Sequence, residues 1–225
     1  WVGARDGTVA SRQVMARILL TRPQGQEREL GTRLTALGHE ILHVALIAIE
    51  PLGDEPIDVA GYDWVVVTSV NGARELRRRA HGPLPRVAAI GRATAEALGR
   101  ADLVPSVSSQ EGLLAELPRP VGRVLFVAAE GARSLLPDEL GADVVPVYRT
   151  RELEPAQLPE ADLVVLASPS AARAYGRAGG VGPAVTIGPE TTRAAVSAGV
   201  DVAGEAVTHD LDGLVAAVDT ALANG

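Results

Sequence analysis

Short apolar runs alternate with helical patterns along most of the chain, and this alternation restricts the fold more than any other feature of the sequence. The clearest runs are RILLT (17–21), WVVVT (64–68), VLFVA (124–128) and LVVLA (163–167). Each is followed by a stretch in which apolar residues recur at helical spacing. Such alternation is typical of βαβ units, whose strands pair in parallel. We therefore predict an α/β fold with mainly parallel sheets.

The rest of the chain follows the same pattern. Further strand candidates are ILHVALIAI (41–49), VAAI (87–90), DVVPVY (143–148) and AVTI (184–187), with weaker ones at 102–104 and 200–203. Helix candidates span 24–37, 72–80, 94–100, 132–140, 171–177, 192–198 and 210–223. Glycines are placed where left-handed C-caps are expected, at Gly38, Gly99, Gly141, Gly179 and Gly199.

An internal repeat divides the chain into two similar parts. TSVNGARELRRRA aligns with ASPSAARAYGRA, which matches Ser69 with Ser168. IGRATAEAL aligns with IGPETTRAA, which matches Gly91 with Gly188. Repeats of this kind indicate two copies of one structural unit. A chain of 225 residues has room for two such domains.

Charge and residue usage exclude several functions. The net charge of −7 makes the average surface repel phosphates and anionic lipids, so we expect neither a nucleic-acid nor a membrane partner. All 21 basic residues are Arg, which excludes a Schiff base or pyridoxal linkage on lysine. The absence of cysteine removes thiol nucleophiles, disulfides and thiolate metal sites.

The N-terminal stretch WVGARDGTVASRQVM lacks the apolar core of a secretory signal, and no run reaches the roughly 18 apolar residues of a membrane span. We therefore expect a cytoplasmic protein. Met15 is the sole methionine and stands two residues before the first strand pattern. Residues 1–14 are interpreted as a tag or fusion remnant.

Short polar side chains occupy the strand-to-helix turns of both repeats. Ser69 and Asn71 follow one strand, and Ser168 and Ser170 follow its counterpart. In an open α/β sheet, ligands bind beyond the carboxyl ends of the strands, where helix N-termini offer free N–H groups. We expect these side chains to cap the helices and to leave other N–H groups for an anion. Capping alone remains the alternative interpretation.

A second pair of turns has the pattern Gly-x-x-Thr. Gly91 precedes Thr94, and Gly188 precedes Thr191. We interpret the glycine as allowing close approach of a ligand and the threonine hydroxyl as the helix cap. If all four turns face one cleft, the ligand carries several separated anionic groups.

Arginine suits such a ligand because its planar fork matches a carboxylate. Arg22, just after the first strand, is the best placed, with Arg92 and Arg193 beside the Gly-x-x-Thr turns. Glu190 also lies in one of these turns, where an acid is unexpected unless it points away or caps the helix.

The histidines form no recognisable metal or catalytic pattern, so we predict no metal site. His39 and His43 are four residues apart, but Gly38 is expected to end the preceding helix, and His81 and His209 are isolated. The Gly-x-Gly-x-x-Gly and P-loop motifs are absent. Tyr148 differs, because it lies in an extended stretch between the repeats and could project into an interdomain crevice. A buried structural tyrosine is the alternative.

An ordered set of motifs resembles the uroporphyrinogen-III synthase family. The motifs are LLTRP, VVVTSVNGARE, AAIGRATAEAL, VPVYRT, LASPSAARAY and TIGPETTRAAVSAG, which together cover nearly all of residues 17–204. The resemblance implies two flavodoxin-like α/β domains with mainly parallel sheets, joined by two extended connectors. Its implied boundaries are 15–48 and 152–225 for the first domain, 51–147 for the second, and 45–51 and 145–153 for the connectors.

The implied reaction closes the linear tetrapyrrole hydroxymethylbilane into uroporphyrinogen III, with inversion of ring D and loss of water, and without metal or cofactor. The resemblance assigns catalytic roles to Tyr148 and Thr191. The substrate carries eight carboxylates, which fits the anion-binding turns, and we expect the protein to act as a monomer. The alternative is a non-catalytic two-domain protein that binds a small polycarboxylate.

Overall fold

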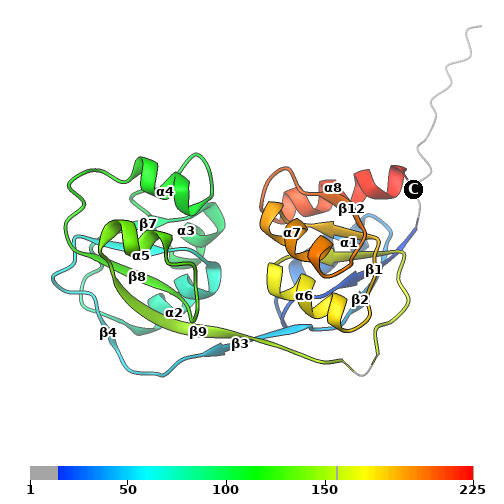
Figure 1. Ribbon diagram of the computed structural model, residues 1–225, viewed down its shortest axis with the longest axis horizontal. Coiled ribbons are helices and arrows are strands. Elements are labelled where there is room, and N and C mark those ends of the chain that lie inside the picture. The colour runs from blue at the N-terminus through cyan, green and yellow to red at the C-terminus, as the bar shows by residue number, and fades with distance from the viewer. Residues whose placement is uncertain (1–14, 156, 225) are drawn as a thin grey trace, which may run out of the picture. The chain divides into compact units, whose positions relative to one another are not determined.

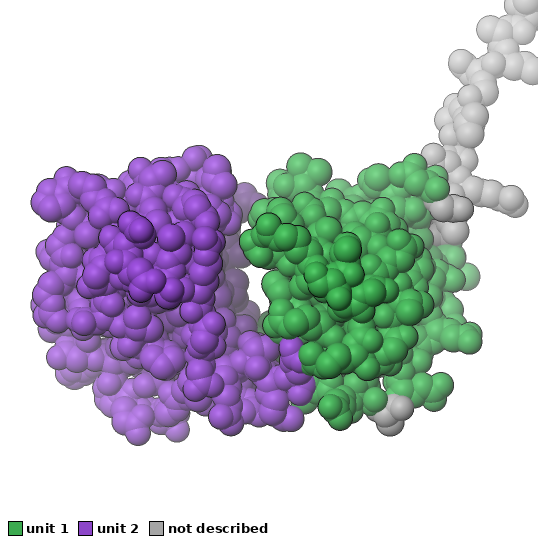
Figure 2. Space-filling model, viewed as in Figure 1, with its two compact units in different colours: residues 1–46, 153–225 green, residues 47–152 purple. Residues whose placement is uncertain are grey.

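The computed structural model describes residues 15–155 and 157–224, which form two compact units (Figure 2). Unit 1 contains the described residues up to Leu46 and from Leu153 onward, and unit 2 is Ile47–Glu152. The segment 1–14, interpreted above as a tag, lies outside the described residues.

Unit 1 is built on a parallel sheet of five strands in the order β12-β11-β10-β1-β2 (Figure 1). Its strands are β1 (Arg17–Leu20), β2 (Glu40–His43), β10 (Leu163–Leu166), β11 (Ala184–Thr186) and β12 (Val202–Glu205). Every neighbouring pair is parallel, as predicted from the βα alternation.

Helices cover both faces of this sheet, because successive strand residues point to opposite sides. Ile18 and Leu20 pack against α1 (Arg28–Ala36) and α8 (Leu211–Asn224). Leu19 packs on the other side, with α6 (Pro169–Arg177) and α7 (Pro189–Ser197). The continuous apolar run of β1 is therefore that of a strand buried on both faces.

Unit 2 contains a second five-stranded sheet, in the order β3-β9-β8-β5-β7. Its strands are β3 (Ile47–Pro51), β5 (Trp64–Val67), β7 (Arg86–Ala89), β8 (Val124–Ala129) and β9 (Asp143–Glu152). All pairs are parallel except β3 with β9. A separate two-stranded ladder joins β4 (Ile57–Asp58) to β6 (Ala80–His81).

The helices of unit 2 also divide between two apolar clusters. Val65 and Val67 pack with α2 (Val70–Arg79) and α3 (Arg92–Leu98). Trp64 and Val66 pack with α4 (Gln110–Glu116) and α5 (Leu135–Leu140).

No helix among the described residues is both long and apolar enough to cross a bilayer.

The apolar run at 41–49 is not one strand. Hydrogen bonds from Val44 N to Leu20 O and from Leu46 N to Thr21 O keep the chain beside β1. From Ile47 the chain instead pairs antiparallel with β9, starting opposite Glu152. Apolarity marks both segments as buried but carries no information on their partners, so the run is divided between two sheets.

Helix ends agree better with the sequence than helix starts. The five glycines expected as C-caps all have positive φ, between 58° and 91°. In contrast, α2, α3, α6 and α7 begin two or three residues before the predicted positions, and α1 begins later, at Arg28. The seven-residue α4 was not predicted, and 102–104 forms only an isolated bridge at Leu103.

Candidate functional site

The polar turns of unit 1 lie at the carboxyl edge of its sheet. Strands β11, β10 and β1 are neighbours in this sheet and run in parallel. Gly188, Ser168 and Arg22 each follow one of these strands within two residues. Parallel strands end at the same edge, so the fold gathers these three positions although they are distant in sequence.

Ser168 is the N-cap of α6, as predicted. Its Oγ accepts a hydrogen bond from the Ala171 N–H at 3.2 Å and lies 3.2 Å from the Ser170 Oγ. Pro169 occupies the first turn, where no N–H is needed. The side chains of Ser168 and Ser170 therefore form a small hydroxyl cluster at the positive end of the helix.

The two threonines of the Gly-x-x-Thr turns are not helix caps, so that prediction is wrong. The N-caps are Gly188 and Gly91 themselves, and neither helix start has a side-chain cap. Because the helices begin early, Thr191 and Thr94 lie inside the first turn, where both residues are buried. Their N–H groups donate to Gly188 O and Gly91 O at 3.0 Å and 3.1 Å.

The acidic residue in the α7 turn has a partner. Glu190 forms an exposed ion pair with Arg193 one turn later. The same arrangement recurs more loosely in unit 2, where Arg92 lies 3.8 Å from Glu96. Both arginines named beside the turns are therefore paired with acids of their own helices.

In unit 2, Tyr148 and Ser69 meet directly. The Tyr148 hydroxyl donates to Ser69 Oγ at 3.0 Å, and Ser69 Oγ also accepts from the Gly72 N–H at 3.0 Å as the N-cap of α2. Tyr148 is only 7% exposed and packs in the apolar cluster around Val67. Burial raises the pKa of Tyr148.

The double role of Ser69 leaves one hydrogen available. A serine hydroxyl accepts two hydrogen bonds and donates one. Gly72 and Tyr148 occupy the two accepting positions. The Ser69 proton is therefore the group that this pair can offer to a ligand. Asn71 lies two residues after Ser69, in the first turn of α2. Gly91 follows β7, which is the neighbour of β5 in the sheet.

Two residues near these turns were missed by sequence reasoning. His209 was considered isolated, yet its ring lies against Gly188, and Ser108 lies against Gly91 in the corresponding way. Each precedes the cap of the following helix, which is Asp210 in unit 1 and Ser109 in unit 2. The stretches VSSQEG (107–112) and THDLDG (208–213) are similar and indicate this correspondence. They lie outside the two pairs of segments that were aligned as repeats.

The structure gives no support for a metal centre. The described residues contain no group of three or more His, Asp or Glu side chains able to hold an ion. His39 precedes β2 and His43 ends it, so the two share no helix.

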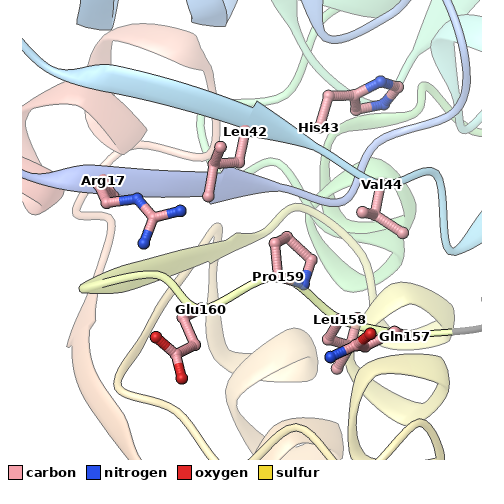
Figure 3. A pocket seen from close by; sticks show the side chains of 8 residues that line it. All are labelled: Arg17, Leu42, His43, Val44, Gln157, Leu158, Pro159 and Glu160. Carbon is pink, nitrogen blue, oxygen red and sulfur yellow. The ribbon is translucent and has the colours of Figure 1, made fainter.

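Unit 1 also has a surface hollow of about 600 Å³. It is lined by Arg17, by 42–44 at the end of β2, and by the segment 157–160 (Figure 3). Figure 3 shows Arg17 and Glu160 toward one end of the hollow and Gln157 toward the other. The lining includes none of the described residues that were named as site candidates.

Comparison with known proteins decides the family. The sequence profile described as "Uroporphyrinogen-III synthase HemD" matches residues 28–216. The chain belongs to the uroporphyrinogen-III synthase family. The resemblance found in the ordered motifs is thereby confirmed.

Curated relatives of the family match part of the chain. A uroporphyrinogen-III synthase of Synechococcus elongatus is 30% identical over 172 residues, which cover 66% of this chain and 65% of the relative. A putative uroporphyrinogen-III synthase of Methanocaldococcus jannaschii is 26% identical over 152 residues, covering 61% and 63%. The chain therefore spans slightly less than two thirds of the length of either relative.

Solved structures of family members share the fold. A mutant uroporphyrinogen III synthase from Thermus thermophilus aligns with a TM-score of 0.61 and 17% identity, covering 93% of this chain and 99% of that one. The Helicobacter pylori uroporphyrinogen-III synthetase aligns with a TM-score of 0.59 and 15% identity, covering 94% and 100%. The α/β class with mainly parallel sheets, predicted from the sequence, is confirmed.

Proposed function

We propose that this protein is a cyclase that converts hydroxymethylbilane into uroporphyrinogen III, with inversion of ring D and loss of one water molecule. The observation that carries the proposal is the match of the family profile over residues 28–216. The direct contact between Tyr148 and Ser69 supports it with a hydroxyl pair suited to the chemistry. The two units correspond, in this proposal, to two flavodoxin-like domains at 15–48 with 152–225 and at 51–147, with connectors at 45–51 and 145–153.

The substrate's carboxylates suit the carboxyl edges of the sheets. Helices α6 and α7 begin there, each with nine residues, and the N-terminus of each helix carries a partial positive charge. Ser168 and Ser170 add hydroxyl donors, and the Arg22 fork adds a positive charge that matches a carboxylate. We propose that these groups hold the carboxylate side chains. Asn71, Gly91 and Thr94 are proposed to serve the same purpose in unit 2.

The first chemical step is departure of the substrate hydroxyl, which leaves an azafulvene. We propose that Ser69 donates its proton toward the departing oxygen, while Tyr148 donates toward Ser69. Burial raises the pKa of Tyr148, so the phenol stays protonated at neutral pH and acts as a hydrogen-bond donor. The pair thus stabilises the negative charge that develops on the leaving oxygen.

The later steps depend on steering. Attack by the substituted carbon of ring D gives a spiro intermediate, and fragmentation with recombination closes the inverted ring. The bilane closes spontaneously to the uninverted isomer, so the enzyme must hold the chain in the geometry of the disfavoured attack. Thr191, buried in the first turn of α7, is proposed to position the substrate. The reaction has no net redox change, so no redox cofactor is required.

The test is an isomer analysis. Hydroxymethylbilane is generated in place by a deaminase, incubated with and without the protein, oxidised, and separated into uroporphyrins I and III. Predominant type III only with the protein present supports the cyclase. Type I in both samples, with folded protein, contradicts it and points to the polycarboxylate-binding alternative.

The net charge of −7 supports a small-molecule substrate without a nucleic-acid or membrane partner.

A further inference from the structure

A histidine that the proposed chemistry leaves unused lies against the start of α7. His209 is exposed, but a Cβ placed on Gly188 would lie 2.9 Å from both Cδ2 and Nε2 of its ring. Gly188 has a φ of 165°, an extended backbone that any residue can adopt. A Cβ at this position would therefore displace the imidazole from its present place, whereas the turn itself does not require glycine.

The same contact occurs at the equivalent place in unit 2. A Cβ on Gly91 would lie 3.1 Å from Ser108 Oγ. Gly91 begins α3 as Gly188 begins α7, so the repeat places one polar side chain over each glycine. In unit 2 this side chain is a neutral hydroxyl, and in unit 1 it is the imidazole of His209.

The following helix holds the histidine in place. Asp210 accepts hydrogen bonds from the Gly213 N–H and from the Thr208 hydroxyl, both at 2.9 Å. Gly213 leaves no room for a side chain, because a Cβ there would lie 1.9 Å from Thr208 O. The backbone on both sides of His209 is thus fixed. Within the described part of the chain, the ring itself has no hydrogen-bond or ion-pair partner.

We propose that His209 is an additional substrate-binding residue, whose ring N–H donates to a carboxylate held at the carboxyl edge of unit 1. The proposal rests on the proposed function and assigns one more contact to the same substrate. An imidazole carries an N–H donor in either protonation state, and it becomes cationic when protonated. Both forms can donate to a carboxylate, and the protonated form adds a positive charge that the hydroxyl of Ser108 lacks.

Three substitutions of His209 test the contact. His209→Ala is expected to raise the KM for hydroxymethylbilane about tenfold, as expected for loss of one hydrogen bond to a charged group, with kcat within about twofold. His209→Arg supplies an N–H donor with a permanent positive charge and is expected to keep KM within about threefold of wild type. Ser108→Ala is the matched control and is expected to change KM less than about twofold. An unchanged KM in His209→Ala overturns the proposal.

Gly188→Ala tests the position of the ring. The added methyl group displaces the imidazole, so KM is expected to rise about as much as in His209→Ala. In the His209→Ala background the methyl group finds no ring, so Gly188→Ala should add less than about a further twofold. A full additional increase in the double variant would mean that Gly188 acts independently of the ring, and this too overturns the proposal.

A binding measurement separates this proposal from the proposed function. Uroporphyrin III carries eight carboxylates, and its fluorescence reports binding without turnover. If the wild-type protein yields no type III isomer, the cyclase assignment fails, while binding still tests His209. About tenfold weaker binding by His209→Ala supports the contact. Equal binding by both proteins, or no binding by the wild type, overturns it.

Discussion

The Tyr148 hydroxyl donates a hydrogen bond to Ser69 Oγ over 3.0 Å, although 79 positions separate the two residues. The bond ties strand β9 to the cap of helix α2, because Ser69 Oγ simultaneously accepts from the Gly72 N–H. Tyr148 is thus a buried tyrosine that ties two elements of unit 2 together, as its alternative interpretation from sequence held. Its projection into an interdomain crevice stays a prediction.

Removing the phenolic hydroxyl should slow the reaction more than it weakens the fold. In Tyr148→Phe, Ser69 loses its donor, and we expect kcat to fall about 10- to 100-fold. The free energy of unfolding should fall by about 1 kcal/mol, because one hydrogen bond is lost. Steady-state kinetics with isomer analysis and a urea titration measure the two effects.

Tyr175→Phe is the control for this substitution. Tyr175 is the buried tyrosine of unit 1, where it packs with α6 and α7. Its loss of a hydroxyl should leave kcat within about twofold of wild type. Equal kcat in Tyr148→Phe and wild type would contradict a chemical role for Tyr148.

Two serine caps of unit 2 provide a matched pair for stability. Ser69 and Ser109 each accept from a backbone N–H three residues ahead at 3.0 Å. Ser109→Ala removes a cap and a minor contact with the exposed Glu111, and should cost about 1 kcal/mol. Ser69→Ala also leaves the buried Tyr148 hydroxyl without an acceptor and should cost about 2 to 3 kcal/mol. Urea unfolding compares them, and equal costs would mean that the tyrosine bond contributes nothing.

Thr191 can be tested without changing its shape. Thr191→Val keeps the branched side chain in its buried site and removes only the hydroxyl. If the hydroxyl positions substrate, kcat/KM should fall about tenfold and the fraction of type I product should rise. Thr191→Ser retains the hydroxyl and should keep most of the activity. Loss of activity in Thr191→Ser with retention in Thr191→Val would instead assign a packing role to this residue.

Acid should destabilise unit 2 through Asp102. Its carboxylate accepts from the Val87 N–H at 2.8 Å and pairs with Arg100 at 2.7 Å, and these contacts hold the pKa of Asp102 below its usual value. A carboxyl group with a lowered folded-state pKa stabilises the fold above its unfolded pKa of about 3.9, and this stabilisation is lost as pH falls through the folded pKa.

The corresponding experiment compares thermal unfolding of wild type and Asp102→Asn over a pH series. At neutral pH the variant should melt at a lower temperature, because the ionised contact is missing. As pH falls below the unfolded pKa of about 3.9, the melting temperature of the wild type should fall more steeply than that of the variant. Parallel pH profiles would show that Asp102 makes no pH-dependent contribution.

Local sequence determined the class of the fold and most of its elements. The apolar runs at Ile18–Leu20 and Val65–Val67 are buried on both sides of their sheets, so short continuous apolar runs alternating with helical patterns were sufficient to identify them. The capping roles of Ser168 and Ser69 were also readable, because a cap involves residues only three positions apart. The gathering of turns at one sheet edge followed from parallel pairing alone.

Tertiary structure decided what depends on partners distant in sequence. The segment around Ile47 leaves one sheet and pairs antiparallel with β9 in another, a choice that an apolar run does not encode. Thr94 and Thr191 are not caps because the helices begin at the preceding glycines. The contacts of Tyr148 with Ser69 and of His209 with Gly188 join residues 79 and 21 positions apart. Such contacts arise only when separate elements pack together, because hydrogen bonding and close packing act between neighbours in space.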